Sequence, residues 1–140
     1  MENEILYDTP NGTIRKIDSF KGKKVLVGDY SNISFDNTLM VLESLGMEVT
    51  REKRLDNIIK RISEGEFYDA IITNNVYEFG GSGLELLKEL RKLQGFSTPV
   101  VIHTISDNTN DCFTSYGFDG YLKKPIKQED TLNVLSKLIR

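Results

Sequence analysis

Residues 68–74, Tyr-Asp-Ala-Ile-Ile-Thr-Asn, form the stretch of sequence that decides the fold. Its apolar centre is short and bounded by polar residues, which is typical of a strand buried on both faces of a sheet. Gly65 precedes the stretch as a turn signal, and the polar, glycine-rich segment 74–83 follows it. This pattern predicts a central strand that ends in a loop. In an open α/β sheet, ligands bind at such a strand end.

Strand-like and helix-like patterns alternate along the rest of the chain. Apolar runs predict further strands at 24–28, 47–50, 100–104 and 120–122. Amphipathic spacing and capping signals predict helices at 31–45, 55–62, 82–93 and from 128 onward, with a weak helix at 108–116. Five successive β–α units indicate an α/β domain with a parallel sheet that is covered by helices on both faces.

The first 22 residues have a different composition from the rest. A turn signal, Pro-Asn-Gly at 10–12, lies between the short apolar stretches 5–7 and 13–15, as in a small hairpin. A poorly ordered tail or a linker would have a similar composition. We therefore expect one domain over 23–140, preceded by an N-terminal tail, linker or small hairpin over 1–22.

Composition excludes several classes of protein. The 140 residues carry a net charge of −3, which gives no general attraction to nucleic acids or anionic membranes. Acidic residues interrupt the one basic cluster, which favours a solvated helix face: Arg51, Lys53, Arg54, Lys60 and Arg61. The sequence contains no signal-peptide pattern and no apolar run long enough to span a bilayer. We expect a cytoplasmic domain that contacts neither nucleic acid nor membrane.

Other residues with chemical potential are better explained by structural roles. Cys112 is the only cysteine, which excludes an internal disulfide, and we expect it to be a packing residue. His103 is the only histidine and lies inside a predicted strand, so a structural side chain is expected. Gly80, Gly81 and Gly83 lack the spacing of nucleotide-binding loops and indicate a flexible loop.

Polar residues stand at the carboxyl ends of four predicted strands. They are Asp29, Asn74, Thr104 and Lys124. In a doubly wound sheet these strand ends converge on one crevice. A carboxylate, an amide, a hydroxyl and an ammonium group together can bind an anion or a metal–phosphate group.

From residue 23 to 140 the sequence resembles the receiver domain of two-component response regulators and hybrid histidine kinases. Three stretches carry the resemblance: Lys-Val-Leu-Val-Gly-Asp-Tyr at 24–30, the central strand at 68–74, and Gly-Phe-Asp-Gly-Tyr-Leu-Lys-Lys-Pro at 117–125. The resemblance implies a flavodoxin-like, doubly wound five-stranded sheet with strand order 2-1-3-4-5. It also implies a role in two-component signal transduction, with a domain that is itself non-catalytic.

The resemblance assigns roles residue by residue. Lys124 corresponds to the lysine that pairs with phosphoryl oxygens, and Thr104 to the switch hydroxyl that follows the phosphoryl group. Tyr121 corresponds to the aromatic residue whose rotamer reports activation. Asp29 corresponds to the first member of the acidic pair that holds a divalent cation.

Two positions depart from the family pattern. Asn74 occupies the phosphoacceptor position, where its neutral amide is too poor a nucleophile to form the usual acyl phosphate. Tyr30 replaces the second acid, so Asp29 alone remains of the acidic pocket and Mg²⁺ is expected to bind only weakly. Glu78, on the following loop, is the alternative source of a carboxylate ligand. No other cofactor is expected.

These features predict a pseudo-receiver of a phosphorelay system that acts through protein–protein contacts. Its expected partners are a histidine kinase, another signalling protein or a second copy of the chain, bound through the face formed by 108–116, 120–122 and the last helix. The alternatives are a phosphoacceptor receiver of a hybrid histidine kinase that uses a non-standard site, and a flavodoxin-like small-ligand binder. Because the chain ends with the last predicted helix, we expect the C-terminal receiver of a hybrid sensor histidine kinase, with a stand-alone regulator as the alternative.

Overall fold

A five-stranded parallel sheet forms the centre of the protein in the computed structural model, which describes residues 5–10, 12–105, 113 and 115–139. Its strands lie in the order β4-β3-β5-β6-β7. Their bounds are β3 (Lys24–Gly28), β4 (Glu48–Glu52), β5 (Ala70–Thr73), β6 (Val100–Thr104) and β7 (Gly120–Lys123). Counted from β3, this is the order 2-1-3-4-5, so the predicted flavodoxin-like fold is confirmed.

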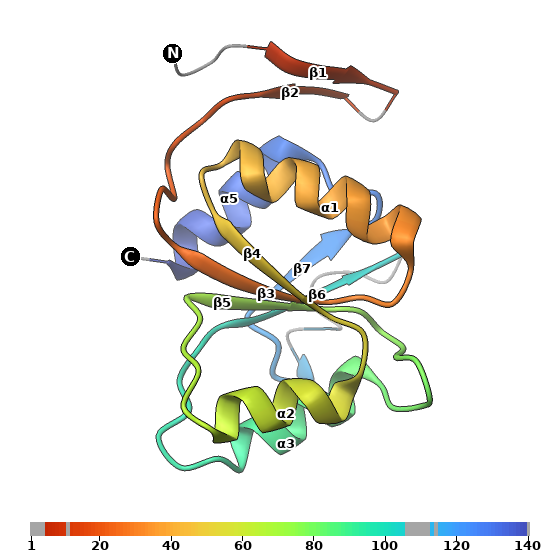
Figure 1. Ribbon diagram of the computed structural model, residues 1–140, viewed down its shortest axis with the longest axis vertical. Coiled ribbons are helices and arrows are strands. Elements are labelled where there is room, and N and C mark those ends of the chain that lie inside the picture. Colours follow the sequence, from red (N-terminus) through yellow and green to blue (C-terminus); the bar gives the residue numbers. More distant parts are fainter. Residues whose placement is uncertain (1–4, 11, 106–112, 114, 140) are drawn as a thin grey trace.

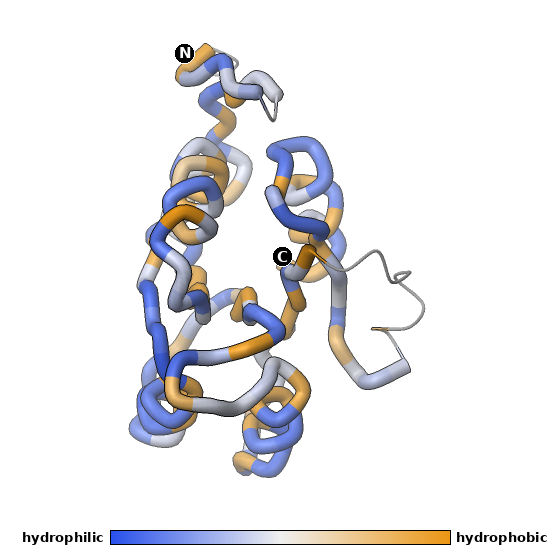
Figure 2. Tube along the Cα trace, turned by 90° about the vertical axis from the view of Figure 1, so that its right-hand side faces the viewer, coloured by the Kyte–Doolittle hydropathy of each residue, from blue (hydrophilic) through white to orange (hydrophobic). Residues whose placement is uncertain are grey.

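Helices cover both faces of this sheet (Figure 1). On one face lie α1 (Asn32–Ser44) and α5 (Gln128–Leu138), and on the other lie α2 (Leu55–Ser63) and α3 (Gly83–Arg91). Apolar and polar residues alternate along the helices (Figure 2), as expected for helices that bury one side against a sheet. Two buried apolar clusters result, one on each side of the sheet.

Capping residues fix the start of two helices close to the sheet edge. The Ser31 side chain accepts a hydrogen bond from the Ser34 N–H at 3.3 Å and caps α1. The Ser82 side chain accepts one from the Glu85 N–H at 3.1 Å and caps α3. Each bond satisfies a donor that a helix start leaves unpaired. The sequence left Ser31 and Ser34 as alternative caps for the first helix, and its capping box predicted Ser82 as the cap of α3.

The central strand β5 is buried along its whole length. Ala70 and Ile72 pack in the cluster beneath α1 and α5, whereas Ile71 packs in the cluster beneath α2 and α3. The Asn74 N–H donates to the Gly28 carbonyl at 2.8 Å and continues the pairing one residue beyond β5. Because side chains alternate along a strand, Asn74 turns toward the α1 and α5 side of the sheet edge.

Some element bounds differ from those predicted. Asp69 lies before β5, and its carboxylate accepts a hydrogen bond from the Lys24 N–H at 2.8 Å. Strand β4 continues through Arg51 to Glu52. Arg51 therefore lies in a strand, and not on the helix face that was predicted for the basic cluster. The weak helix predicted at 108–116 falls mostly on residues outside the described part of the chain, as does Cys112.

An antiparallel hairpin precedes the sheet and lies beside α1 and α5 (Figure 1). Its strands are β1 (Ile5–Thr9) and β2 (Gly12–Arg15). Ile14 and Phe20 are only 4% and 6% exposed and join the apolar cluster beneath α1 and α5. The Ile17 N–H donates to the Ser44 carbonyl at 2.7 Å. The segment from Gly12 to Phe20 is therefore packed against the helices.

Within the described residues, the helices are all too short or too polar to cross a membrane.

Candidate functional site

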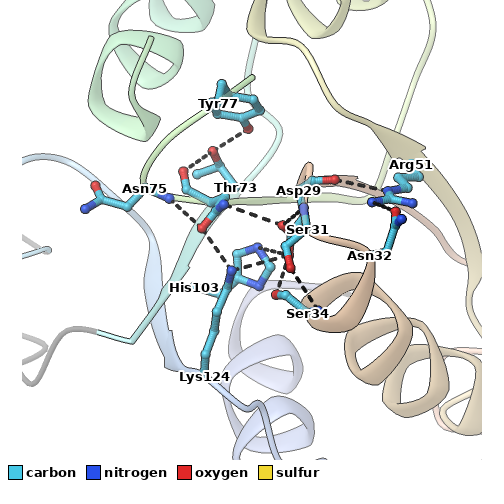
Figure 3. Close-up of polar contacts among 11 residues, drawn as sticks. Asp29, Ser31, Asn32, Ser34, Arg51, Thr73, Asn75, Tyr77, His103 and Lys124 are labelled. Carbon is cyan, nitrogen blue, oxygen red and sulfur yellow. Dashed lines mark hydrogen bonds and ion pairs between the residues drawn. The ribbon is translucent and has the colours of Figure 1, made fainter. Parts of the chain in front are cut away.

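The carboxylate of Asp29, directly after β3, lies at the centre of a buried polar cluster (Figure 3). Its Oδ1 accepts a hydrogen bond from the Ser31 N–H at 3.0 Å, and its Oδ2 accepts one from the Ser34 hydroxyl. The Lys124 ammonium, from the end of β7, lies 3.3 Å from the same Oδ2. Three donors from two elements thus surround a carboxylate with no exposure to solvent.

The side chain of Asn74 completes this cluster and is held in one orientation. Its Oδ1 accepts hydrogen bonds from the Lys124 Nζ at 3.0 Å and from the Asn75 N–H at 2.9 Å. Its Nδ2 donates to Asp29 Oδ1 at 3.5 Å. The ammonium and the N–H can only donate, and the carboxylate can only accept. These neighbours therefore fix which end of the amide is oxygen and which is nitrogen.

Asp29 and Lys124 give the cluster one negative and one positive charge. The side chain of Asp29 is fully buried and that of Lys124 is 12% exposed. Removing one member of such a pair leaves an uncompensated buried charge, so the two depend on each other. Asn74 between them adds hydrogen bonds but no charge.

His103 lies beneath this ion pair and is fully buried. Its Nε2 is 3.8 Å from Asp29 Oδ2, and within the described residues neither ring nitrogen has a hydrogen-bond partner. Burial, followed by the charge of Lys124, lowers the pKa of His103 to about 4. The charge of Asp29 and the carbonyl of Gly28 act in the opposite direction on that pKa, but more weakly. The imidazole is therefore neutral at neutral pH.

The buried neutral His103 should make the protein less stable in weak acid. Its pKa is about 4 in the folded protein and 6.5 in an unperturbed chain. As the pH falls from 6.5 towards 4, His103 binds a proton in the unfolded chain but not in the folded chain. The free energy of unfolding therefore falls by at most about 1.4 kcal/mol per pH unit. Urea unfolding across this pH range measures the slope, and His103→Leu should reduce it. An unchanged slope in that variant would assign the acid sensitivity to other groups.

Thr104 lies next to Lys124 of the Asp29 cluster, and Tyr121 makes an aromatic contact. Thr104 ends β6 with 5% exposure, and its carbonyl accepts a hydrogen bond from the Lys124 N–H at 2.8 Å. Tyr121 lies in β7 and stacks on Phe113, with ring centroids 5.0 Å apart. Tyr30, which follows Asp29, is 43% exposed. The structure thus joins Asp29, Asn74 and Lys124 directly, and places Tyr121 in an aromatic contact with Phe113.

Arg51 is a member of the site that the sequence pattern did not reveal. Its Nε donates to the Asp29 carbonyl at 3.0 Å, and its Nη2 donates to Asn32 Oδ1 at 2.9 Å. Its guanidinium also lies 4.5 Å from the ring centroid of Phe35. The interpretation of this arginine as part of a solvated helix face is wrong, because β4 pairs with β3 and brings it beside the Asp29 loop.

Tyr77 fixes the loop that follows β5. Its side chain is only 5% exposed, and its hydroxyl lies 2.6 Å from Thr73 Oγ1. Since Thr73 Oγ1 donates to the Asn74 carbonyl at 2.9 Å, the Tyr77 hydroxyl is the donor in the other bond. Burial raises the pKa of Tyr77, which keeps the hydroxyl protonated. Tyr77 was not predicted from the sequence, because the same loop also contains Val76 and Phe79, which are apolar and exposed.

The oxygen ligands at this sheet edge do not fit a magnesium ion. Mg²⁺ prefers several hard, anionic oxygen ligands in octahedral geometry. Asp29 offers one carboxylate, and the Lys124 ammonium is already 3.3 Å from it. Across the described part of the chain, no three His, Cys, Asp or Glu side chains gather closely enough to hold a metal, so Glu78 does not complete such a group.

Comparison with known proteins shows the same fold and one matching family. The family model named "Response regulator receiver domain" matches residues 25–136. The receiver domain of a sensor histidine kinase from Pseudomonas aeruginosa PAO1, solved with a magnesium ion in its active-site cleft, is 22% identical with a TM-score of 0.73. That alignment covers 84% of this chain and 97% of the other.

Two further solved structures are similar over almost their whole length. The receiver domain of the Francisella response regulator 1452 is 26% identical with a TM-score of 0.67, and the alignment covers 83% of this chain and 94% of that one. The chemotaxis response regulator CheY4 of Vibrio cholerae is 23% identical with a TM-score of 0.71, and the alignment covers 84% of this chain and 98% of that one.

Proposed function

Because this chain belongs to the response regulator receiver domain family, we propose that it is a pseudo-receiver, a module of two-component signalling that acts through protein–protein contacts. In this proposal the chain is not phosphorylated at the usual position. The observation that carries the proposal is Asn74 at the end of β5, with its amide oxygen bound by Lys124 and Asn75. The neutral amide cannot attack a phosphoryl donor as a carboxylate does.

The electrostatics of the cluster support the same proposal. A group of carboxylates repels itself until a cation or a phosphoryl group arrives, and that repulsion favours switching between states. Here Asp29 is paired with Lys124 at 3.3 Å, and Asn74 bonds both. The charges of Asp29 and Lys124 therefore balance each other, which favours one settled arrangement of these side chains.

A phosphodonor assay tests the proposal. Freshly purified protein incubated with acetyl phosphate and Mg²⁺ should keep its intact mass, because residue 74 lacks a nucleophilic carboxylate. The variant Asn74→Asp with Tyr30→Asp is the positive control and should gain one phosphoryl group. Asn75→Asp, which places the same charge on the next residue, is the matched negative control. A stable phosphoryl group on the unsubstituted protein would instead support a receiver that uses a non-standard site.

Two surface cavities lie away from the strand-end cluster. A cavity of about 370 Å³ lies between the segment 12–17 and the helices α1 and α5. Another, of about 620 Å³, lies along α2 and α3. Neither cavity is lined by Asp29 or Asn74.

The partner in this proposal is a histidine kinase, another signalling protein or a second copy of the chain, met in the cytoplasm. The docking face comprises β7, α5 and the segment 108–116, which lies largely beyond the described residues. The domain is non-catalytic towards other molecules, either within a sensor histidine kinase or alone. It comprises 23–140, and the preceding segment is an addition packed on α1 and α5 through Ile14 of the hairpin and through Phe20, which follows the hairpin.

A further inference from the structure

The amide oxygen of Asn74 receives two hydrogen bonds that together resemble an oxyanion hole. Lys124 Nζ lies 3.0 Å from Asn74 Oδ1, and the Asn75 backbone nitrogen lies 2.9 Å from it. Donors that converge on one carbonyl oxygen stabilise the negative charge that develops there when a nucleophile attacks the carbon. One of these donors is a cation, so its attraction grows as that charge forms.

A carboxylate faces the other end of the same amide. Asp29 Oδ1 lies 3.5 Å from Asn74 Nδ2. A carboxylate at this place can take a proton from an attacking water molecule and deliver it to the departing nitrogen. Asn74 is 7% exposed, and the proposed hydrolysis requires a water molecule to reach its Cγ through that small exposed part.

We propose that Asn74 is a self-modification site at which the protein hydrolyses its own side-chain amide to aspartate. The water oxygen bonds to Asn74 Cγ, and Asp29 takes the proton that the water releases. Lys124 and the Asn75 N–H stabilise the oxyanion. The Cγ–Nδ2 bond then breaks, and the nitrogen leaves as ammonia with the proton held by Asp29. The ammonia takes the proton of the new carboxylic acid, so amide and water become carboxylate and ammonium.

The backbone around Asn74 disfavours the common alternative route of asparagine deamidation. In that route the following backbone nitrogen attacks the side-chain carbon, and the cyclic imide opens to both aspartate and isoaspartate. Here the Asn75 N–H points to Oδ1 as a donor. The Asn74 N–H is held by the Gly28 carbonyl at 2.8 Å, and the Asn74 carbonyl is held by Thr73 Oγ1 at 2.9 Å. Hydrolysis by water should therefore yield aspartate alone.

This inference rests on the proposed function, since the unmodified chain is the pseudo-receiver and the hydrolysed chain carries a carboxylate at the acceptor position. Each of the two proposals can fail without the other. If residue 74 never converts, the pseudo-receiver proposal stands. If unconverted protein accepts a phosphoryl group, the pseudo-receiver proposal fails while the hydrolysis is judged on its own measurement.

Peptide mass spectrometry of the full chain, kept for days at neutral pH in heavy-oxygen water, tests the hydrolysis. We expect a growing fraction of aspartate at position 74 that carries one heavy oxygen and no isoaspartate. The sequence supplies an internal control, because Asn11 precedes Gly12 and such pairs convert through the backbone route. Residue 74 remaining an amide after Asn11 has converted, or converting to isoaspartate, would overturn the proposal.

A variant pair separates the role of the Lys124 ammonium from general charge effects. Lys124→Met should slow conversion at position 74 by about 100-fold, as expected for the loss of one oxyanion donor. Lys123→Met removes the same charge from the neighbouring exposed lysine and should leave the rate unchanged. Circular dichroism checks that both variants fold. Conversion of folded Lys124→Met at the wild-type rate would overturn the proposal. If Lys124→Met does not fold, the isotope measurement on the wild-type chain is the test of the proposal.

Discussion

Asn74→Asp combined with Tyr30→Asp should raise the affinity of the strand-end cluster for Mg²⁺ by about 100-fold, or about 2.7 kcal/mol. The double variant places carboxylates at the ends of β3 and β5, beside Asp29. Together they outweigh the Lys124 ammonium that now pairs with Asp29 at 3.3 Å. Tyr30 is 43% exposed, so its replacement removes little buried apolar surface. Asn74→Asp alone should raise the affinity less, because it supplies two carboxylates where the double variant supplies three.

Calorimetric titration with Mg²⁺ measures this effect, and changes in amide chemical shifts locate the bound ion. Asn75→Asp is the matched control, because it adds the same charge one residue further along on an exposed side chain. That variant should bind no better than the wild type. Submillimolar binding by the wild-type protein would show that Asp29 and its neutral neighbours form a better site than their chemistry predicts.

Gly28→Ala should destabilise the protein by about 3 kcal/mol or more. A Cβ atom at this position would overlap the phenol group of Tyr77 and would lie 2.9 Å from Ile58 Cδ1. Both side chains are buried, so neither can move aside without disturbing the core. A displaced Tyr77 would also lose its hydrogen bond to Thr73, which lies directly before Asn74.

Urea unfolding of Gly28→Ala, Tyr77→Phe and the double variant measures this contact as a double-mutant cycle. Tyr77→Phe removes the oxygen that the new Cβ would overlap. The double variant should therefore be destabilised by less than the sum of the two single variants. A Gly28→Ala variant within about 0.5 kcal/mol of the wild type would mean that Tyr77 moves freely, contrary to its burial and hydrogen bond.

Local sequence patterns were sufficient for the fold, because each element carries its own signal. The β5 stretch is apolar on both faces, and the caps Ser31 and Ser82 mark helix starts. The predicted sheet and strand order are confirmed. Because Asp29, Asn74 and Lys124 each follow a predicted strand, they were also predicted to lie at one sheet edge. The structure joins them there by hydrogen bonds. Their functional roles remain predictions.

The contacts that the sequence could not predict depend on neighbours that only the folded chain brings together. Arg51 reaches the Asp29 carbonyl because β4 lies beside β3, and no local pattern specifies that reach. Tyr77 turns inward because Gly28 leaves room for its ring. His103 was expected to be structural from its place in a strand, but its distance of 3.8 Å from the Asp29 carboxylate is a property of the packed sheet.

The docking of the N-terminal segment affects where this protein can be cut without loss of solubility. Phe20 lies outside the residues matched by the family model, 25–136, as does Ile139 at the other end. Both side chains are less than 9% exposed and share one apolar cluster with α1. A fragment trimmed to the family boundaries would lose both and leave apolar surface open to water. Exposed apolar surface favours aggregation. A fragment that stays in solution should therefore extend beyond residues 25–136 at both ends, so that it includes Phe20 and Ile139.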